Sequence, residues 1–501
     1  DLYFPNGSFD GAHTVTADVS DHAGNPAAEA SKPLTVDETP PAQPLVTDLV
    51  LSDDGSGGTR LALDGGIDAD TTIAVADGSG PLGTPNAGAG GWDDTIDPLA
   101  SGDHMIAITA SDEAQNTASA NFEVNLVDST HVTIDLTNVG TGVPDVDTTG
   151  LPTGTNVTVN GSSTGGDGIV TGDGADNITT HGGSTVLAGA GSDVLNGGAD
   201  ETFYGEAGND TITFSGSGSA AGYHGDYDPS ANSTDRDYSL ERTGADTWVV
   251  TALTGAGHTE TDLGTDNVTG ADVLQFDGNG AALATADLIS LISDSDNSTD
   301  TVAEGATATT YTGLDAVAAS QDGTVSYSLT DNAGGRFAID GSGNVTVTAF
   351  GASRIDYESS GGSYDITVKA LSTDGSFTTQ DFTIAVTDAA PSVPVDSDNT
   401  NANTVVEGAA SGTYTGLTAS STDVNGGAVT YSLIGDTSGG GFAVDASGAV
   451  KIADALKVDF GGDSDDAAAT VHYQWQSSDG GSFSAGHVVP IGSDSATYLV
   501  T

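Results

Sequence analysis

Three seven-residue segments decide how this chain folds: Gly172-Asp173-Gly174-Ala175-Asp176-Asn177-Ile178, Gly189-Ala190-Gly191-Ser192-Asp193-Val194-Leu195 and Glu206-Ala207-Gly208-Asn209-Asp210-Thr211-Ile212. Their aspartates (176, 193, 210) and their aliphatic residues (178, 195, 212) both advance by 17 positions. Apolar residues also recur between them, every eight to nine positions, in weaker segments that end at Ile169, Leu187 and Phe203 or Tyr204. A flexible Gly/Asp-rich linker would have no reason to keep its aliphatic residues in register with its aspartates.

This regularity predicts a short parallel β-roll, in which two short strands make one turn of a coil and residues about 17 apart stack. Glycine allows the connecting turns to adopt positive φ at little steric cost. The stacked turns bring carbonyl and carboxylate oxygens together, and hard oxygen ligands suit Ca²⁺. We therefore predict one Ca²⁺ between the first two turns and a second between the last two. The predicted ligands are Asp176, Asp193 and Asp210, with the turns of Gly174, Gly191 and Gly208.

The opposite side of the roll matches the pattern less well. Asp167 fits it, but Thr185 takes the equivalent place in the next turn, and Glu201 or Thr202 the one after. We expect that side to bind Ca²⁺ weakly or to remain empty.

Acidic residues dominate the charge of this 501-residue chain, because 72 Asp and Glu stand against 9 Lys and Arg, for a formal net charge of -63. Aspartate outnumbers glutamate roughly five to one, which favours chelating turns, since Asp is common in turns and Glu in helices. A halophile's solvated acidic surface is the alternative, and both can hold. Nucleic acid and anionic membrane surfaces are poor partners for such a charge, because phosphate binding needs clustered Lys and Arg, and we expect no nucleic acid partner.

Several other classes of protein are excluded. The chain has no cysteine, and therefore neither disulfides nor thiolate metal sites. No stretch approaches the roughly 18 apolar residues that predict membrane insertion. No signal peptide is present, and Asp1 opens in the middle of a domain pattern, so we expect a longer polypeptide.

Residues 1–39 and 40–128 share an internal repeat. In the first copy, a strand in which Val15, Ala17 and Val19 alternate inward is followed by Asp21-His22-Ala23-Gly24-Asn25 and by Asp37. The second copy has the same order: a strand at 102–110, then Asp112-Glu113-Ala114-Gln115-Asn116, then Asp128. Trp92 is the expected core anchor of the second copy. This order resembles bacterial Ig-like domains of surface adhesins. The resemblance implies the end of one domain (1–39) and a complete one (40–128). Asp21, Asp37, Asp112 and Asp128 are either ligands of an interdomain ion or turn caps.

The roll lies in residues 129–214, and a further β segment follows at 215–292. That segment contains strands at Tyr238-Ser239-Leu240 and Trp248-Val249-Val250, and its only expected helix runs from Ala284 to Ser293. Roll and following segment resemble the RTX (repeats-in-toxin) proteins, which are exported by type I secretion.

Residues 293–390 and 391–501 form a second pair of modules, each with several short alternating strands. The first has Tyr327-Ser328-Leu329, Phe337-Ala338-Ile339 and a strand expected at Ile355-Asp356-Tyr357-Glu358. This order resembles cadherin-like repeats, whereas the end of the second module looks as much Ig-like as cadherin-like. The resemblance implies Ca²⁺ ligand roles for Glu304, Asp356 and Glu358, and more weakly for Glu407. The cadherin Asp-x-Asn-Asp linker is absent, since Asp388 is followed by Ala389-Ala390-Pro391.

No catalytic motif has the context it needs. Gly161-Ser162-Ser163-Thr164-Gly165 fits Gly-x-Ser-x-Gly, but without the strand-to-helix turn of a nucleophile elbow. His224-Gly225-Asp226-Tyr227-Asp228 is the only compact His/Asp cluster, and nothing near it in sequence makes it a metal centre. We therefore expect a non-enzymatic, all-β, multidomain chain of Ig-like and cadherin-like sandwiches flanking a short parallel β-roll.

Three functions compete. The first is a Ca²⁺-stabilised stalk or spacer of a large secreted bacterial surface adhesin, located at the cell surface and exported by type I secretion. The second is a self-assembling surface-layer or filament subunit, and the third is the non-catalytic part of a secreted RTX hydrolase. The expected partners are other copies or domains of the same surface protein, with cell-surface glycans or proteins as further candidates.

Overall fold

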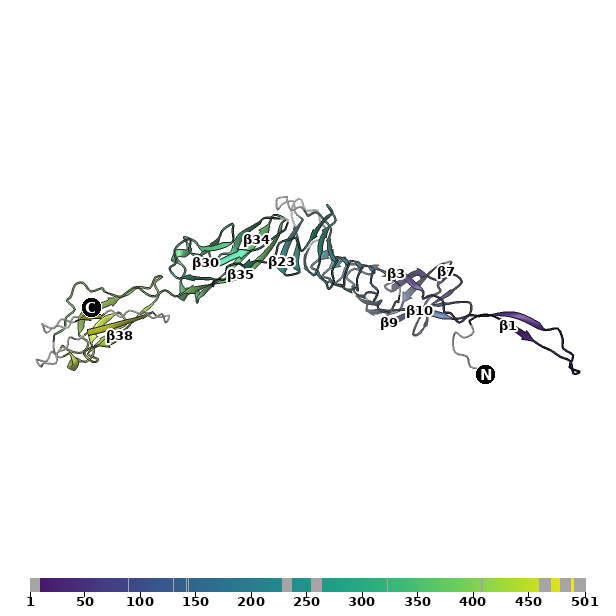
Figure 1. Ribbon diagram of the computed structural model, residues 1–501, viewed down its shortest axis with the longest axis horizontal. Helices are drawn as coiled ribbons and strands as arrows, with labels where there is room; N and C mark the ends of the chain where they lie inside the picture. Colours follow the sequence, from purple (N-terminus) through teal and green to yellow (C-terminus); the bar gives the residue numbers. More distant parts are fainter. Residues whose placement is uncertain are drawn as a thin grey trace. The chain divides into compact units, whose positions relative to one another are not determined.

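The computed structural model describes residues 10–88, 90–128, 130–140, 142, 144–227, 237–253, 264–321, 323–406 and 409–458, with the backbone of 470–477 and 488–490. The chain divides into two compact units. Unit 1 comprises Asp1–Leu291, Ala319–Val325 and Leu371–Thr378; unit 2 comprises Ile292–Ala318, Ser326–Ala370 and Thr379–Thr501. Both units are built almost entirely of β-strands (Figure 1). None of the helices among the described residues is long and apolar enough to cross a membrane.

Residues 40–128 form a sandwich of two antiparallel sheets. One sheet contains β3 (Leu45–Asp53), β4 (Thr59–Gly66), β8 (Gly91–Leu99) and β7 (Asn86–Gly88); the other contains β10 (Thr117–Asp128), β9 (Gly102–Ser111), β5 (Thr72–Asp77) and β6 (Gly80–Pro81). Inward residues alternate along the longer strands, and Leu49, Ile108 and Phe122 are at most 1% exposed. The expected anchor Trp92 is confirmed, because it is 3% exposed and donates from Nε1 to the Leu45 carbonyl.

The roll is a parallel coil whose alternate strands build two sheets. One sheet stacks β11 (His131–Asp135), β13 (Asn156–Asn160), β15 (Asn177–Thr179), β18 (Val194–Gly197), β21 (Thr211–Phe214) and β25 (Thr265–Thr269). The other stacks β12 (Asp145–Gly150), β14 (Gly168–Val170), β16 (Thr185–Leu187), β19 (Thr202–Tyr204), β22 (Ala220–Tyr223) and β26 (Val273–Phe276). Ile178 pairs with Leu195 and Leu195 with Ile212, and all three are fully buried as predicted.

On the second sheet the inward residue of the middle strand differs from the prediction. Ile169 pairs with Val186 and Val186 with Phe203, and all three are fully buried. Leu187, the predicted inward residue, points away from this core and is only partly buried. The reason is that the 17-residue step also governs this sheet, so the residue after Ile169 is Val186 and not its neighbour.

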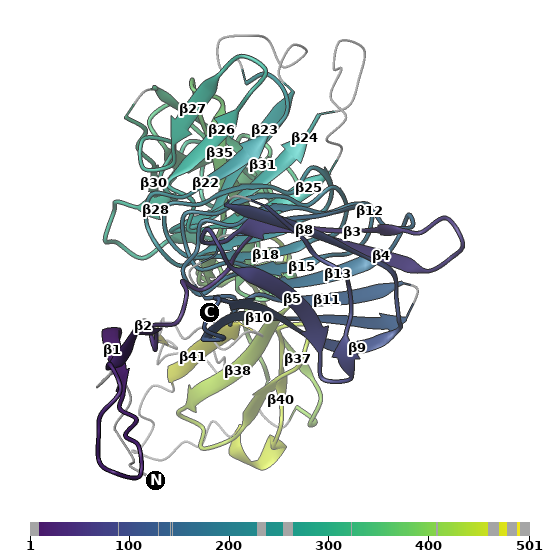
Figure 2. The same cartoon turned by 90° about the vertical axis from the view of Figure 1, so that its right-hand side faces the viewer.

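Both sheets of the sandwich continue directly into the coil. β3 pairs in parallel with β12, and β10 pairs antiparallel with β11. At the far end, the predicted strands β23 (Tyr238–Gly244) and β24 (Thr247–Ala252) are confirmed as an antiparallel hairpin that pairs with β25, while β27 (Ala281–Ala284) pairs with β26. Figure 2 looks along this stack of strands. Main-chain hydrogen bonds therefore join the sandwich to the coil without an intervening linker.

Residues 10–36 form a separate two-stranded ribbon of β1 (Gly11–Ala17) and β2 (Ala30–Val36). The strand over Val15 was expected to be half-buried, and this is wrong, because Val15 is 54% and Val19 68% exposed. Among the described residues, no second sheet covers the ribbon.

Unit 2 contains two copies of one arrangement. The first has a sheet of β28 (Ser293–Asp294), β30 (Tyr311–Val317), β33 (Asn344–Val347) and β32 (Phe337–Ile339). The second repeats that order with β36 (Val395–Asp396), β37 (Tyr414–Ser420), β40 (Ala449–Ile452) and β39 (Phe442–Val444). The facing strands are β29 (Thr301–Ala303), β31 (Val325–Asp331), β34 (Ser363–Ser372) and β35 (Ser376–Thr387) in the first copy, and β38 (Val429–Asp436), β41 (Thr470–Ser477) and β42 (Val488–Pro490) in the second.

Two predicted elements are wrong. Residues 284–293 are not helical, because the Thr285 amide donates to the Asp272 carbonyl and the Ser290 amide to the Ala319 carbonyl, instead of bonding within a helix. Ile355–Glu358 is not a strand, because helix α1 (Tyr357–Ser360) begins there. Asp356 caps α1 by accepting from the Ser359 amide at 2.8 Å, and short 3₁₀ turns occur at Gly351–Ser353 and Ala455–Lys457.

The glycine turns of the coil generate a testable prediction. An added Cβ at Gly191 would lie 1.6 Å from the Gly174 carbonyl oxygen, and one at Gly208 would lie 1.4 Å from that of Gly191. Because the clash is with backbone, Gly191→Ala should force stacked turns apart and lower the free energy of unfolding of unit 1 by about 2–3 kcal/mol. Chemical denaturation checks this. Gly78→Ala, where nothing lies within 4 Å, should change the stability by less than about 0.5 kcal/mol; equal losses in both variants would contradict the steric argument.

Candidate metal sites

A column of carboxylates runs along the first sheet of the coil. Asp193 Oδ1 accepts the Asp176 amide at 2.8 Å, and Asp210 Oδ1 accepts the Asp193 amide at 2.8 Å. Asp176 itself accepts the Val157 amide at 2.7 Å. The three aspartates predicted from the 17-residue step are therefore brought together, each bonded to the backbone of the preceding coil.

A fourth carboxylate extends this column and was missed by sequence reasoning. Asp266 Oδ1 accepts the Asp210 amide at 2.9 Å, although the two residues are 56 positions apart. The insertion that contains β23 and β24 separates them. A sequence pattern that identifies Asp266 is nevertheless present, because Gly264-Thr265-Asp266-Asn267-Val268 repeats the pattern of Gly208-Asn209-Asp210-Thr211-Ile212.

The second oxygen of each predicted aspartate lacks a partner. Asp176, Asp193 and Asp210 are at most 1% exposed, and among the described residues nothing forms a hydrogen bond with their Oδ2 atoms. Burial raises the pKa of all three, that of Asp193 to about 8 and that of Asp210 to about 6, and for Asp193 the neighbouring carboxylates add to the rise. A buried carboxylate with one uncompensated oxygen needs a proton or a cation. Oxygen donors on stacked turns suit a hard cation such as Ca²⁺.

The predicted glycines pack tightly on these turns. Gly191 pairs with Gly208 through the short parallel strands β17 (Ala190–Gly191) and β20 (Ala207–Gly208). The Gly174 amide donates to the Ala190 carbonyl at 2.7 Å. The three glycines therefore let the main chains of successive turns approach beside the column.

The column on the second sheet has a different composition from the predicted one. Gly168 pairs with Thr185, so the residue equivalent to Asp167 is Ser184 and not Thr185, and the next is Glu201 and not Thr202. The error again came from counting 18 residues per coil where the step is 17. Asp167 is fully buried and accepts the Ser162 amide at 2.8 Å through Oδ2. In the part of the chain that the structure describes, its Oδ1 has no partner.

In unit 2, Glu304, Asp356 and Glu358 come together. One carboxylate oxygen from each lies within 4.8 Å of the others. Glu304, 3% exposed, accepts the Tyr357 amide at 3.1 Å and the Ala389 amide at 2.9 Å. Asp356 is fixed by its capping bond to α1. The structure thus places the three residues named by the cadherin resemblance in one group, while Glu407 lies outside the described residues.

A segment of the second copy of unit 2 lies beside this group, which the sequence did not indicate. Asp423 is 7% exposed, its Oδ1 accepts the Asn425 and Gly427 amides at 3.0 and 2.9 Å, and its buried Oδ2 has no partner among the residues described. An added Cβ at Gly427 would lie 3.1 Å from the Asp423 carboxyl carbon and 3.4 Å from that of Glu358. The Asn425 side-chain amide also donates to the Ile355 carbonyl. The segment 423–427 therefore packs against the acidic group of the first copy.

The acids of the Ig-like copies are used in turns. Asp21 accepts from the Ala23 and Asn25 amides at 2.9 Å, and Asp112 accepts from the Asn116 amide at 2.8 Å. Asp37 accepts from the Thr39 amide and Asp128 from the Thr130 amide. This is the geometry of turn-capping aspartates.

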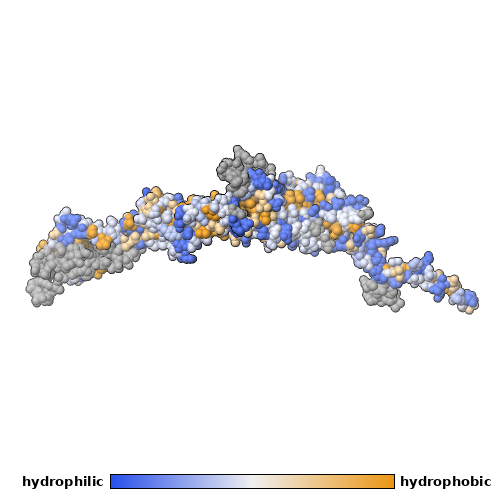
Figure 3. Space-filling model, turned by 45° about the horizontal axis from the view of Figure 1, so that its top comes forward, coloured by the Kyte–Doolittle hydropathy of each residue, from blue (hydrophilic) through white to orange (hydrophobic). Residues whose placement is uncertain are grey.

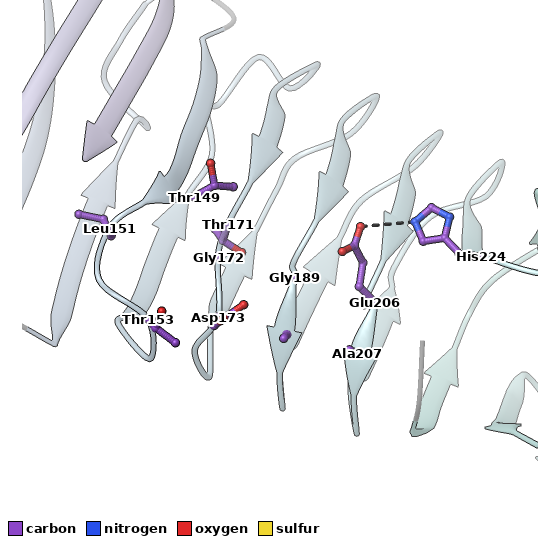
Figure 4. A pocket seen from close by; sticks show the side chains of 11 residues that line it. Thr149, Leu151, Thr153, Thr171, Gly172, Asp173, Gly189, Glu206, Ala207 and His224 are labelled. Atoms are coloured by element: carbon purple, nitrogen blue, oxygen red, sulfur yellow. Dashed lines mark hydrogen bonds and ion pairs between the residues drawn. The ribbon is translucent and has the colours of Figure 1, made fainter. Parts of the chain in front are cut away.

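His224 has partners that its sequence neighbours did not reveal. Its Nδ1 lies 2.6 Å from Asp277 Oδ2, its Nε2 lies 3.4 Å from Glu206 Oε1, and its ring stacks on Tyr204. Together, hydrogen bonds and charge from Asp277 and Glu206 raise the pKa of His224 despite burial of the ring. Figure 4 shows His224 and Glu206 at one end of a groove of about 410 Å³ whose walls also include Thr149, Thr171 and Asp173. The imidazole links successive coils by hydrogen bonds.

Ser162 does not stand on a nucleophile elbow. It follows β13 and precedes β14, both strands of the coil, and its amide is bonded to Asp167. The Gly-x-Ser-x-Gly match is thus part of a coil turn.

Solved structures similar to this chain include cadherin extracellular domains. Protocadherin gammaB7 EC3-6 is 11% identical over 96% of this chain and 82% of that chain, with a TM-score of 0.25. Drosophila N-cadherin EC1-4 is 13% identical over 97% and 83%, with a TM-score of 0.26, and human protocadherin-24 EC1-2 is 15% identical over 41% and 95%, with a TM-score of 0.23. No family model and no curated protein matches the chain. Similarities of this size transfer no residue role or activity.

At one equivalent position, the first copy of unit 2 carries an aspartate, Asp300, and the second an asparagine, Asn403. Asp300 precedes Thr301-Val302 as Asn403 precedes Thr404-Val405, and both valines are buried. Asn403 Nδ2 donates to Asp396 Oδ2 at 2.9 Å. Asp300 cannot donate such a bond when ionised, and its buried Oδ1 has no partner within the described ranges. Burial, with Asp294 and Asp296 nearby, raises its pKa to about 6.

Asp300→Asn should therefore stabilise unit 2 at neutral pH. Folded Asp300 keeps its proton to about pH 6, whereas its ordinary pKa is 3.8, so the wild-type acid makes the folded state less stable as pH rises from about 4 through 6. The substitution should remove that slope and add about 1 kcal/mol above pH 7, allowing for the partial exposure of the side chain. Urea unfolding of wild type and Asp300→Asn at pH 4.5 and 8 measures the pH dependence of the stability and the stability gained at high pH.

The reciprocal substitution is the matched control. Asn403→Asp should introduce a slope of the same sign in the second copy. If Asp300→Asn left the difference between the two pH values unchanged, the assignment of the raised pKa to Asp300 would be wrong.

Proposed function

We propose that the chain is a Ca²⁺-stabilised extracellular segment, a stalk or spacer of a large secreted bacterial surface adhesin, without catalytic activity of its own. The observation that carries the proposal is the set of buried carboxylates in the coil, each with one oxygen that nothing else compensates. Stacked acids of this kind need a proton or a cation, and we propose the cation. The extracellular medium supplies Ca²⁺ at near-millimolar concentration, within the range of extracellular sites that bind in the 10⁻⁴–10⁻³ M class.

The residues present fit such an ion in both units. In unit 1 the ligands would be Asp176, Asp193 and Asp210, and in unit 2 Glu304, Asp356 and Glu358, joined by Asp423. Bound Ca²⁺ would supply the positive charge that these oxygens lack. Without it, the carboxylates repel one another and their desolvation is not offset. The chain would accordingly be exported unfolded through type I secretion and would become ordered outside the cell.

A stalk role suits the rest of the molecule. The described residues build several β-modules, and the Gly-x-Ser-x-Gly match at residues 161–165 is part of a coil turn. On the visible face in Figure 3, hydrophobic residues are interspersed among hydrophilic ones. The proposed partners are neighbouring domains or copies of the same surface protein, with cell-surface glycans or proteins as further ligands.

A self-assembling surface subunit is the second candidate, and the β1–β2 ribbon favours it. Val15, Val19 and Leu34 are 54%, 68% and 48% exposed there. Exposed apolar strands with open edges pair readily with other chains.

The Ca²⁺ proposal predicts a large effect of chelation. Each site filled at tenfold its dissociation constant adds roughly 1.4 kcal/mol, so several sites together should raise the melting temperature by many degrees. Circular dichroism melts of the whole chain in EGTA and in millimolar Ca²⁺ measure this, with Mg²⁺ as the ion control. Coincident melting curves would rule the mechanism out.

In the same melting experiment, two variants show how much of the Ca²⁺-dependent stabilisation comes from each unit. Asp193→Asn should reduce the Ca²⁺-dependent gain of unit 1, and Glu304→Gln that of unit 2. Each should leave the other unit's gain unchanged.

Electron microscopy separates stalk from subunit. We expect purified chains in millimolar Ca²⁺ to remain single particles. Regular filaments or lattices that disappear in the double variant Val15→Thr, Leu34→Thr would instead establish the second candidate.

A further inference from the structure

Two arginines of unit 2, Arg336 and Arg354, have no acidic partner in the part of the chain that the structure describes. Their guanidinium groups donate instead to main-chain carbonyls and to one serine hydroxyl. Three other cations, Arg60, Lys451 and Lys457, each lie within 4.0 Å of an aspartate oxygen. Acids are abundant in this chain, with 72 of them against 9 Lys and Arg. The positive charge of Arg336 and Arg354 therefore remains available to a carboxylate of another molecule.

Aromatic rings hold both guanidinium groups at the surface. Cζ of Arg336 lies 4.8 Å from the centre of the Tyr364 ring, and Cζ of Arg354 lies 4.0 Å from that of Phe350, which is 49% exposed. Arg336 Nε and the Tyr364 hydroxyl both donate to the Arg354 carbonyl, at 3.0 and 3.1 Å, so the two arginines belong to one cluster. Arginine and aromatic residues are common among the residues that dominate binding at protein interfaces. We call Arg336, Phe350, Arg354 and Tyr364 the arginine patch.

A row of four aspartates crosses the outer face of one sheet in unit 1. Across β12, β3, β4 and β8, the register pairs Asp145 with Asp48, Asp48 with Asp64 and Asp64 with Asp93. Three of the four are exposed and Asp48 is half-buried, on the face opposite the sandwich core. No Lys or Arg among the described residues lies within 4.0 Å of any of them. Because like charges directly opposite one another destabilise a sheet, this aspartate row has a cost that a cationic partner would remove.

An extended cationic partner fits the aspartate row better than a metal ion does. Within the described ranges, the only acids that bring three ligand atoms within 4.8 Å of one another are those of the Glu304 group, so the row does not converge on one point. Neighbouring strands are about 4.8 Å apart, and the row therefore presents its carboxylates along a line. A guanidinium group binds a carboxylate through two parallel hydrogen bonds, and two guanidinium groups side by side can engage successive members of such a line.

We propose that copies of this chain contact one another through these two surfaces, with the arginine patch of one copy against the aspartate row of another. The inference rests on the proposed function, which names copies of the same surface protein as partners. Because the two surfaces differ, the contact is head-to-tail and can continue from copy to copy. Both surfaces are small, and small interfaces are weak and transient. The contact therefore forms where copies are crowded on a cell surface and dissociates between dilute particles.

The net charge of the chain does not prevent this contact. A formal charge of -63 repels copies at long range, but at physiological ionic strength such repulsion is largely screened beyond about 8 Å. The opposed charges of the arginine patch and the aspartate row act at contact distance, where screening is weakest.

Sedimentation velocity of the full chain in millimolar Ca²⁺, over a wide range of protein concentration, tests the contact. The average mass of wild type should rise with concentration. The rise should be lost in the double variant Arg336→Glu, Arg354→Glu and in the double variant Asp48→Lys, Asp64→Lys. The matched control is Lys451→Glu, Lys457→Glu, because these side chains are 43% and 45% exposed and already lie beside aspartates. It changes the net charge as much as the arginine variant does, and it should associate like wild type.

Mixing the two reversed variants identifies the surfaces that meet. Neither should associate alone, since each then opposes like charges. In the mixture, the introduced glutamates face the introduced lysines and the unchanged surfaces face each other, so association should return. A mixture that stays monomeric although wild type associates would show that these surfaces do not meet.

The remaining outcomes separate this inference from the proposed function. A wild type that stays monomeric at every concentration overturns the contact, while Ca²⁺-dependent melting still tests the stalk. Association of either reversed variant at the wild-type level also overturns it. If the arginine variant does not fold, Asp48→Lys, Asp64→Lys decides alone, because it changes only outward side chains and relieves the repulsion in the row.

Discussion

Negative charge held in a fixed stack is the constraint on which unit 1 depends. Parallel strands repeat at about 4.8 Å, and the hydrogen bond from each aspartate amide to the next aspartate holds the carboxylates at that repeat. The column cannot spread to relieve repulsion without breaking the backbone bonds that define the coil. Folding and the compensation of these carboxylates are therefore coupled, and on the proposed function the surrounding Ca²⁺ concentration would become part of the folding problem.

The same reasoning explains the composition of the turns. A chain that carried its acids on exposed loops could use any small residue beside them. Here the main chains approach so closely that Gly191 and Gly208 have no room for a side chain. Glycine and aspartate are thus coupled: the first permits the stack, and the second buries in it a carboxylate that a proton or a cation must compensate.

Much of unit 1 could be predicted from the sequence, because a fixed step converts directly into stacking. The aspartate column and its aliphatic partners Ile178, Leu195 and Ile212 followed from one number. The 17-residue step was applied only to the face that carries Asp176. On the face that carries Asp167 the step was taken as 18 residues, which misplaced Thr185 and Leu187. Asp266 was missed because a hairpin separates it from Asp210. In unit 2, Asp423 and Glu358 lie beside the same residue, Gly427, only through packing between copies, and α1 formed where a strand was expected because Asp356 caps it locally.

The continuity of the sheets from the sandwich into the coil has a mechanical consequence. Tension applied along the stack of coils acts on main-chain hydrogen bonds directly, since no flexible connection precedes them. Coils can then detach one after another. Each 17-residue coil that opens gives up about 5 Å of stack and releases close to 60 Å of extended chain. On the proposed function, Ca²⁺ between neighbouring turns would have to leave first, and the calcium concentration would set the force at which this extension begins.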